Sequence, residues 1–390
     1  MKISTTTTGA ALTLAVLALT GCTDNTASNS ADGTVRVSST ESECTLSTTE
    51  VKAGKNTFSV TNDGSQVTEF YVLAEDGLRI LSEVENIGPG ITRDLTVNLA
   101  EGTYKTSCKP GMVGDGIIGD LTVAANPDES PVSADEQALR DTAITQYTAY
   151  IKDQTEQLKT KTDAFADAYA TGDDEQARSL YAAARLHYER IEPVAESFGD
   201  LDPQLDLREA DLEEGQTWTG WHLIEKDLWQ PTAEDNGGQA YTPLTESQRK
   251  DAATQLKEDT QSLYDQTRDL ELTLDQITNG AKSLLDEVAF SKVTGEEEIW
   301  SHTDLSDFQG NIDGARVAFE DVRPLLEAKD AELAQTIDGR FNDIQSLLDQ
   351  HRDNEGFVPY TQLSEDQVRE LSDAIDALSE PLSQLTGILV

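Results

Sequence analysis

Short apolar runs, several of them alternating with polar residues, dominate the first third of the chain. They lie at 56–60, 70–73, 95–99 and 121–123, and the segments between them contain Gly with Asn, Asp or Pro. Runs of this length predict strands, and the Gly-containing segments predict tight turns. Residues 35–124 are therefore expected to form a small β-sandwich.

The pattern changes near residue 125. Residues 125–133 are rich in Asp, Ser and Pro and predict a linker. Beyond the linker apolar residues recur at helical spacing, as in Tyr147, Ile151 and Leu158, and Gly and Pro become less frequent. Residues 134–390 are therefore expected to form an all-α domain, which makes the fold class a β-sandwich followed by helices.

Two segments of the helical region recur. Tyr-Thr-Pro-Leu-Thr-Glu-Ser-Gln at 241–248 returns as Tyr-Thr-Gln-Leu-Ser-Glu-Asp-Gln at 360–367, and the pattern His-x-acid-x-x-acid occurs at 187–192 and again at 302–307. The number of residues from the first copy to the second is nearly the same for both segments. This predicts two related helix bundles whose acidic faces meet at one cleft.

The N-terminus predicts export. Lys2 precedes an apolar run at 10–19, and Leu-Thr-Gly-Cys at 19–22 has the form of a lipobox. The chain is similar to a bacterial lipoprotein, with a signal peptide at 1–21, a lipid on Cys22 and a flexible tether at 22–34. The alternative is an ordinary secretory signal with an incidental cysteine, which also exports the protein. No later segment is apolar enough to cross a membrane.

Charge limits the partners. The chain has 29 basic and 73 acidic residues, and its net charge is −44. Nucleic acid is excluded as a ligand, because its binding requires Lys and Arg to neutralise phosphates. An acidic surface attracts cations, but it is also a common adaptation for solubility or salt tolerance.

The segment Gly220-Trp-His222-Leu-Ile-Glu225 is the strongest candidate for chemistry. On a helix, His-x-x-Glu points an imidazole and a carboxylate the same way, and the chain has only four histidines. The pair is half of a metal site. The alternative is a partly buried histidine that its glutamate stabilises.

Further ligands would come from the repeated acidic pattern. Oxygen donors near His222 and Glu225 would favour iron, manganese or zinc over copper(I), and hard iron(III) in particular. Taken singly, each carboxylate is more typical of a solvated helical face. His187 and His302 are weaker candidates, because position i does not share a face with i+2. The predicted additional ligands are Glu189, Glu192, Asp304, Asp307 and Asn311.

These residues carry a family resemblance. Gly-x-His-x-x-Glu at 220–225 is similar to the signature of the imelysin, or peptidase-like, family, and the segments 190–202, 301–309, 67–73 and 108–112 also match. After the tether, the chain resembles the extracytoplasmic components of bacterial elemental-iron uptake systems, which join a cupredoxin-like domain to the helical domain. The resemblance implies iron capture outside the membrane, with a haem peroxidase and a high-affinity iron permease as partners.

The β region leaves two interpretations open. Cys44 and Cys108 are the only cysteines besides Cys22, and paired cysteines of exported proteins usually form a disulfide. Alternatively, the resemblance implies a copper site that uses Cys44, Glu69, Cys108 and Met112 and oxidises Fe(II). Residues 1–186 contain no histidine, so an ordinary two-histidine blue-copper site is excluded.

Peptidase activity and the binding of a polysaccharide or a chelated metal are two other functions to compare with the capture of a free ion. Peptidase activity is not expected, because Glu225 is followed by Lys226 and no His-Glu-x-x-His, inverted zinc motif or Gly-x-Ser-x-Gly segment occurs. A module that binds a polysaccharide or a chelated metal is the alternative to free-ion capture, with sugars stacking on Trp218, Trp221, Trp229 and Trp300.

Overall fold

The computed structural model describes residues 34–77, 79–114, 116–127, 132–199, 201–212, 215–290, 292–354 and 356–390. The predicted signal peptide, Cys22 and the tether up to residue 33 lie outside the described residues. Among the described residues, no helix combines the length and apolar character needed to span a bilayer.

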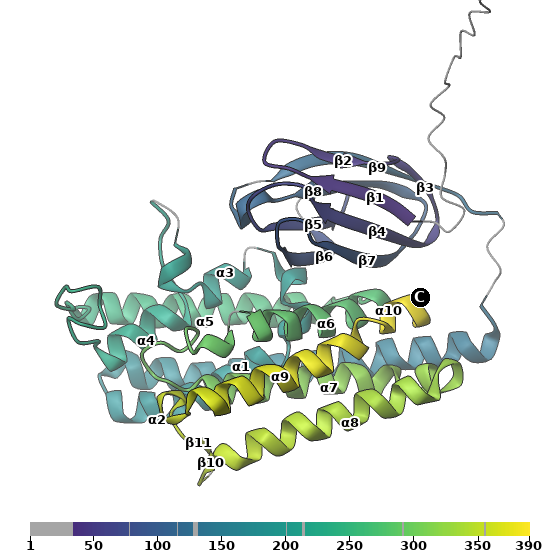
Figure 1. Ribbon diagram of the computed structural model, residues 1–390. Coiled ribbons are helices and arrows are strands. Elements are labelled where there is room, and N and C mark those ends of the chain that lie inside the picture. The colour runs from purple at the N-terminus through teal and green to yellow at the C-terminus, as the bar shows by residue number, and fades with distance from the viewer. Residues whose placement is uncertain are drawn as a thin grey trace, which may run out of the picture.

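The N-terminal region is a sandwich of two sheets, as predicted (Figure 1). The first sheet has the order β2-β1-β4-β7, with β1 Thr34–Ser39, β2 Cys44–Leu46, β4 Gly54–Asn62 and β7 Thr92–Leu99. The second has the order β3-β9-β8-β5-β6, with β3 Glu50–Lys52, β5 Thr68–Leu73, β6 Ile80–Ile87, β8 Gly102–Cys108 and β9 Ile117–Ala124. The pairs β1/β4 and β3/β9 are parallel and the other strand pairs are antiparallel.

Alternation within the strands builds the core of the sandwich. Phe58 and Val60 of β4 are buried on one side, and they face Phe70 and Val72 of β5. The rings of Phe58 and Phe70 have centroids 5.4 Å apart, which is a favourable aromatic contact. A disulfide between Cys44 and Cys108 joins the two sheets.

The C-terminal region is helical and begins at Ala134, where Ser133 caps the first helix. Its long helices pack in an elongated array, and β10 and β11 form a small hairpin at one end (Figure 1). The helices are α1 Ala134–Thr171, α2 Asp174–Glu189, α3 Leu201–Asp206, α4 Trp221–Trp229, α5 Glu246–Arg268, α6 Leu274–Phe290, α7 Asp304–Lys329, α8 Ala331–Leu348, α9 Glu365–Leu382 and α10 Leu385–Leu389. The hairpin strands are β10 Arg352–Asp353 and β11 Gly356–Phe357.

The repeated segment has the same structure in both copies. Thr245 and Gln248 form a capping box at the start of α5, and Ser364 and Gln367 form one at the start of α9. The apolar residues of both halves nevertheless belong to one continuous core. The halves therefore form a single domain rather than two bundles with separate cores.

The sandwich lies against α6 (Figure 1). The Asn279 side chain donates hydrogen bonds to Ser82 Oγ at 2.9 Å and to the Thr96 carbonyl at 2.8 Å. Arg93 pairs with Asp286 at 2.6 Å, and side-chain burial strengthens this contact relative to a fully exposed pair. Polar contacts between β6, β7 and α6 thus fix the two domains relative to each other.

Candidate metal centre

Helix α4 carries the Gly-x-His-x-x-Glu motif at its start. Gly220 precedes the helix with φ of 85°, and a Cβ at this position would lie 2.1 Å from the Leu205 carbonyl oxygen. Only glycine permits both this backbone conformation and this close approach to α3. The approach places His222 beside Asp206, the last residue of α3.

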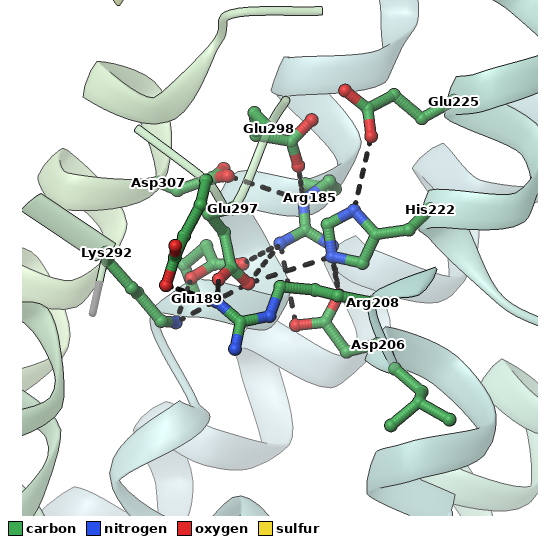
Figure 2. Close-up of polar contacts among 12 residues, drawn as sticks. Arg185, Glu189, Asp206, Arg208, His222, Glu225, Lys292, Glu297, Glu298 and Asp307 are labelled. Carbon is green, nitrogen blue, oxygen red and sulfur yellow. Dashed lines mark hydrogen bonds and ion pairs between the residues drawn. The ribbon is translucent and has the colours of Figure 1, made fainter. Parts of the chain in front are cut away.

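His222 contacts carboxylates through both ring nitrogens (Figure 2). Its Nδ1 lies 3.3 Å from Glu225 Oε2, while its Nε2 lies 3.4 Å from Asp206 Oδ1 and 3.7 Å from Glu297 Oε1. The imidazole is 1% exposed, and Nε2 has no hydrogen-bond partner. Two groups among the described residues have metal-site geometry: Asp206, His222 and Glu297, and His222, Glu225 and Glu298.

Glu225 is fixed by the chain segment before α7. Its Oε1 accepts hydrogen bonds from the backbone N–H groups of Trp300 at 3.1 Å and Ser301 at 2.7 Å, and its Oε2 faces His222 Nδ1. A carboxylate that accepts a hydrogen bond from Nδ1–H orients the ring and directs Nε2 toward a metal. This arrangement favours the group on the Nε2 side as the ligand set.

Arg185 of α2 lies at the centre of the cluster, fully buried (Figure 2). Its guanidinium pairs with Glu189 and Glu298, each at 2.6 Å, and with Asp206, while Asp307 is 3.5 Å away. Asp307 otherwise has no hydrogen-bond partner on either oxygen. One guanidinium thus serves several acidic groups, and burial raises the pKa of Asp307 well above its usual value despite the nearby Arg185.

A second buried cation, Lys292, lies at the other side of Glu189. It belongs to a single 3₁₀ turn, Lys292–Thr294, and pairs with Glu189, Glu192 and Glu297. Asn311 of α7 donates hydrogen bonds to the carboxylates of the same Glu189 and Glu192. The inner glutamates are therefore bridged by an ammonium and an amide.

Electrostatics separate the two possible ligand groups. Burial acts to raise the pKa of Glu297, but Lys292 and His222 overcome it and hold that pKa at about 2. Burial likewise opposes ionisation of Asp206, and Arg185 and His222 hold its pKa well below its usual range. Burial and the neighbouring Glu225 instead raise the pKa of Glu298 to about 8. Burial and Arg185 oppose protonation of His222, but its contacts with Asp206, Glu225 and Glu297 raise its pKa well above its usual value. The two carboxylates on the Nε2 side are thus ionised beside a protonated imidazole, which loses a proton when a metal binds, whereas Glu298 keeps its proton at neutral pH.

Two cavities meet at the Nε2 side. One, of about 640 Å³, is lined by His222, Glu297 and Trp300 and by the surface residues Asp235 and Ile299. The other, of about 400 Å³, lies between the domains and is lined by Asp206, Glu192 and Glu297 together with Glu85, Asn86 and Met112 of the sandwich. They share Arg208, Asp211, Glu296 and Glu297. Among the described residues, His222, Asp206 and Glu297 line these cavities, whereas Glu225 and Glu298 line neither, which favours entry of an ion from the Nε2 side.

The predicted metal-site residues all lie in this one cluster, contributed by α2, α4, α7 and the turn after α2. Proximity does not show which of them coordinate, and their role as ligands stays a prediction. The residues brought together are Glu189, Glu192, His222, Glu225, Asp304, Asp307 and Asn311.

Sequence reasoning missed the other members of the cluster. Arg185, Asp206, Lys292, Glu297 and Glu298 occupy four separate segments and share no spacing with the motif. The one usable signal was the run of three glutamates at 296–298, two residues before the segment 301–309 that carried the family resemblance.

The repeat did not extend to its histidines. His187 lies in the last turn of α2, and its Nδ1 contacts Gln154 Oε1 at 2.8 Å, away from the cluster. His302 precedes α7 in the left-handed region, with φ of 58°. His187 thus lies at the C-terminal end of its helix, whereas His302 lies just before the N-terminal end of its helix. The segments 187–192 and 302–307 therefore do not occupy equivalent positions on their helices.

The β-domain prediction needs a correction. Cys44 and Cys108 form a disulfide, so neither sulfur is a thiolate, and the copper interpretation of the two cysteines is contradicted in favour of the disulfide. Glu69 is buried and accepts a hydrogen bond from Tyr71, while Met112 is 39% exposed. Among the described residues, both groups with metal-site geometry lie in the helical domain.

The tryptophans do not support a sugar-stacking surface. Trp221 is fully buried against Phe165 and Tyr181, and Trp229 packs edge-on to Tyr181. Trp218 and Trp300 pack on each other and on the Lys226 ammonium. Trp221 and Trp229 are therefore packed in or against the core, and Trp300, with Trp218 packed on it, lines the cavity of about 640 Å³.

Comparison with known proteins agrees with this architecture. Residues 143–385 match the imelysin family and residues 11–123 match the cupredoxin-like domain family. The fold and the buried histidine–carboxylate cluster thus define a cupredoxin-like protein with an imelysin domain.

Curated relatives narrow the class. The iron uptake system component EfeO of Yersinia pseudotuberculosis is 38% identical over 358 residues, 91% of each chain. EfeO of Yersinia pestis is 38% identical over 359 residues and EfeO of Escherichia coli is 37% identical over 358 residues, again covering 91% of each chain. The chain belongs to the EfeO family of imelysin proteins.

Proposed function

We propose that this protein captures iron outside the cytoplasm and holds it at Asp206, His222 and Glu297. The observation that most supports this proposal is the position of His222 Nε2, which is buried without a hydrogen-bond partner. It lies between two carboxylates that are ionised at neutral pH, where two cavities meet. One nitrogen with carboxylate oxygens suits iron, although zinc and manganese accept the same donors. The relatives' name, iron uptake system component, supports iron as the cargo.

The proposal places the protein at the membrane surface. Cleavage before Cys22 and lipidation of its thiol would anchor the chain through its tether. Anchoring keeps the captured ion at a high effective concentration near an iron permease, the proposed acceptor, with a haem peroxidase of the same uptake system as a further partner. Copper-dependent oxidation is left out of the proposal, because the disulfide removes both thiolates.

Metal content tests the proposal. The purified protein, loaded with Fe(II) without oxygen and then desalted, is expected to retain iron by elemental analysis. Replacing a direct ligand, as in His222→Ala or Glu297→Gln, should lower the affinity for iron by at least about tenfold, a loss of about 1.4 kcal/mol of binding free energy. His351→Ala is the matched control, because His351 lies in the 3₁₀ turn Asp349–His351 after α8, outside the cluster.

Helical content measured by circular dichroism separates loss of the site from loss of the fold. Iron that stays bound in a well-folded His222→Ala protein would contradict the ligand assignment. A wild-type protein that retains no iron would contradict the proposed function itself.

A further inference from the structure

Lys292 is an unusual component of an iron site, because it is a fully buried amine. Its side chain is 1% exposed, and its Nζ lies 2.5 Å from Glu192 Oε1, 3.4 Å from Glu189 Oε2 and 4.0 Å from Glu297 Oε1. Carboxylates from three separate segments thus converge on one ammonium. Converging carboxylates of this kind are typical of a site that binds a metal ion.

Asn311 completes the surroundings of the same two glutamates. Its Nδ2 donates to Glu189 Oε2 at 3.0 Å and to Glu192 Oε2 at 2.5 Å. Glu189 Oε2 therefore lies near both the ammonium and the amide, whereas Glu192 has one oxygen near each. Its Oδ1 is fully buried without a hydrogen-bond partner. A buried amide oxygen without a donor costs free energy, and it is an available ligand for a cation.

The ammonium position adjoins the proposed iron position. Glu297 Oε1 lies 4.0 Å from Lys292 Nζ and 3.7 Å from His222 Nε2. A single carboxylate therefore lies between the two positions, as it does where two metal ions share a bridging carboxylate in a helical protein.

We propose that Lys292 occupies the place of a second metal ion and thereby limits the site to one iron. This inference rests on the proposed function. The ammonium is tethered, carries a single charge and offers no ligand, so it neutralises Glu189 and Glu192 without exchanging with solvent. Removing it would leave Glu192 without its ammonium partner and Glu189 paired with Arg185 alone, which favours the uptake of another cation.

Stoichiometry is the test. The wild-type protein and Lys292→Met are each equilibrated with Fe(II) without oxygen, and bound iron per chain is measured. The wild type is expected to bind one ion and Lys292→Met two. In parallel, Mn(II) is the probe for electron paramagnetic resonance, and only the variant should give the spin-coupled signal of a neighbouring pair.

Two further variants serve as controls. Lys292→Arg keeps a fixed cation and should bind one ion. The double variant Glu192→Gln with Lys292→Met removes one charge of each sign together with a ligand, and should also bind one ion. If Lys292→Met does not fold, Lys292→Gln replaces it, because its neutral amide can donate to Glu192 and the expected stoichiometry is again two.

The outcomes separate the two proposals. A wild type that binds one ion and a folded neutral variant that also binds one would overturn the role of Lys292 and leave iron capture intact. Two ions in the wild type would overturn the role of Lys292 directly. A wild type that binds no iron would instead count against the proposed function.

Discussion

The two nitrogens of His222 have different surroundings, and this difference assigns them different tasks. Nδ1 faces Glu225, whose other oxygen is held by two backbone N–H groups, whereas Nε2 faces the cavities without a partner. Glu225 therefore orients the imidazole, because a metal-binding histidine almost always donates its other ring N–H to a carboxylate, a carbonyl or water. In this interpretation the motif encodes one ligand and its positioning residue.

Glu225→Gln tests this division of tasks. We expect the variant to keep one iron per chain but to bind it about 10–100-fold more weakly, as is typical when a histidine loses its orienting carboxylate. Titration with Fe(II) monitored by calorimetry measures the change. Asp206→Asn is the comparison, and a Glu225→Gln protein that has lost all iron, like a ligand variant, would show that Glu225 coordinates directly.

His187 gives the folded protein a separate dependence on pH. Burial, and then the charge of Arg190, lower the pKa of His187 to about 4. The unfolded chain, with an ordinary histidine pKa near 6.5, binds more protons between those values, so the stability of the fold falls as pH falls from about 6.5 to about 4. Because solvent screens this partly exposed group, the loss for this residue stays below the roughly 3 kcal/mol that the full difference in pKa would give.

His187→Gln should remove that part of the pH dependence. Urea unfolding of the variant at pH 7 and at pH 4.5 is expected to differ by less than in the wild type, because glutamine does not titrate. His351→Gln is the control and should keep the wild-type difference. Equal pH dependence in His187→Gln and in the wild type would show that His187 does not cause it.

Residues of the cluster could be predicted where a local spacing marked them. His222 and Glu225 lie on one helical turn, and the acidic repeat indicated Glu189 and Asp307. Asp206 and Lys292 belong to short segments that only tertiary packing brings to the site, so no periodicity marks them. The cysteines illustrate another limit, since the same two residues fit a disulfide and a copper site until their distance is known.

At the scale of elements, the site depends on the close approach of α2 and α7. A Cβ at Gly310 would lie 2.5 Å from Glu189 Cβ, and one at Gly314 would lie 2.4 Å from the Arg190 carbonyl oxygen. The two glycines are one helical turn apart and form a smooth strip against the end of α2. This strip allows Glu189 and Asp307 to reach the same guanidinium.

Gly310→Ala should therefore damage the fold and the site together. We expect a loss of about 1–3 kcal/mol of stability, the usual result of overpacking, and weaker iron binding because Glu189 is displaced. Gly339→Ala on the exposed face of α8 is the matched control: nothing lies within 4 Å of its Cβ, and it should stabilise the protein by about 0.5–1 kcal/mol. A Gly310→Ala protein as stable as wild type would show that the helices have room to separate.

Elements were more predictable than the contacts between them. The four apolar runs of the N-terminal region lie within β4, β5, β7 and β9, because period and turn composition are local properties. The repeated Thr/Ser-x-x-Gln segments each formed a capping box for the same local reason. The merging of both halves into one core depends on packing between distant segments, which a repeat alone does not specify.

At the scale of the whole molecule, the disulfide and the proposed iron site belong to different domains. Cys44 and Cys108 join the two sheets of the sandwich across 64 positions of sequence. In the chain-entropy description, closing a loop of that length stabilises the folded state by roughly 4 kcal/mol. The sulfurs therefore contribute to the stability of the sandwich and not to binding the ion.

The double variant Cys44→Ser with Cys108→Ser should accordingly unfold its β domain more easily, by roughly 4 kcal/mol, yet still bind one iron per chain. Thermal unfolding, followed in the far ultraviolet for strands and helices separately, measures the first effect and elemental analysis the second. Wild-type protein treated with a thiol reductant is the control and should show the same destabilisation. Loss of iron from a folded double variant would show that the sulfurs take part in binding.

The two cavities that meet at Glu297 give the site two openings. In a site with one opening, an ion must leave by the opening through which it entered, so an acceptor has to compete with the solvent for that opening. Here one opening is lined by surface residues of the helical domain and the other by the sandwich as well. Under the proposed function, loading and unloading would therefore use different sides, and a receiving protein would take the ion from one side while the supply side stays available.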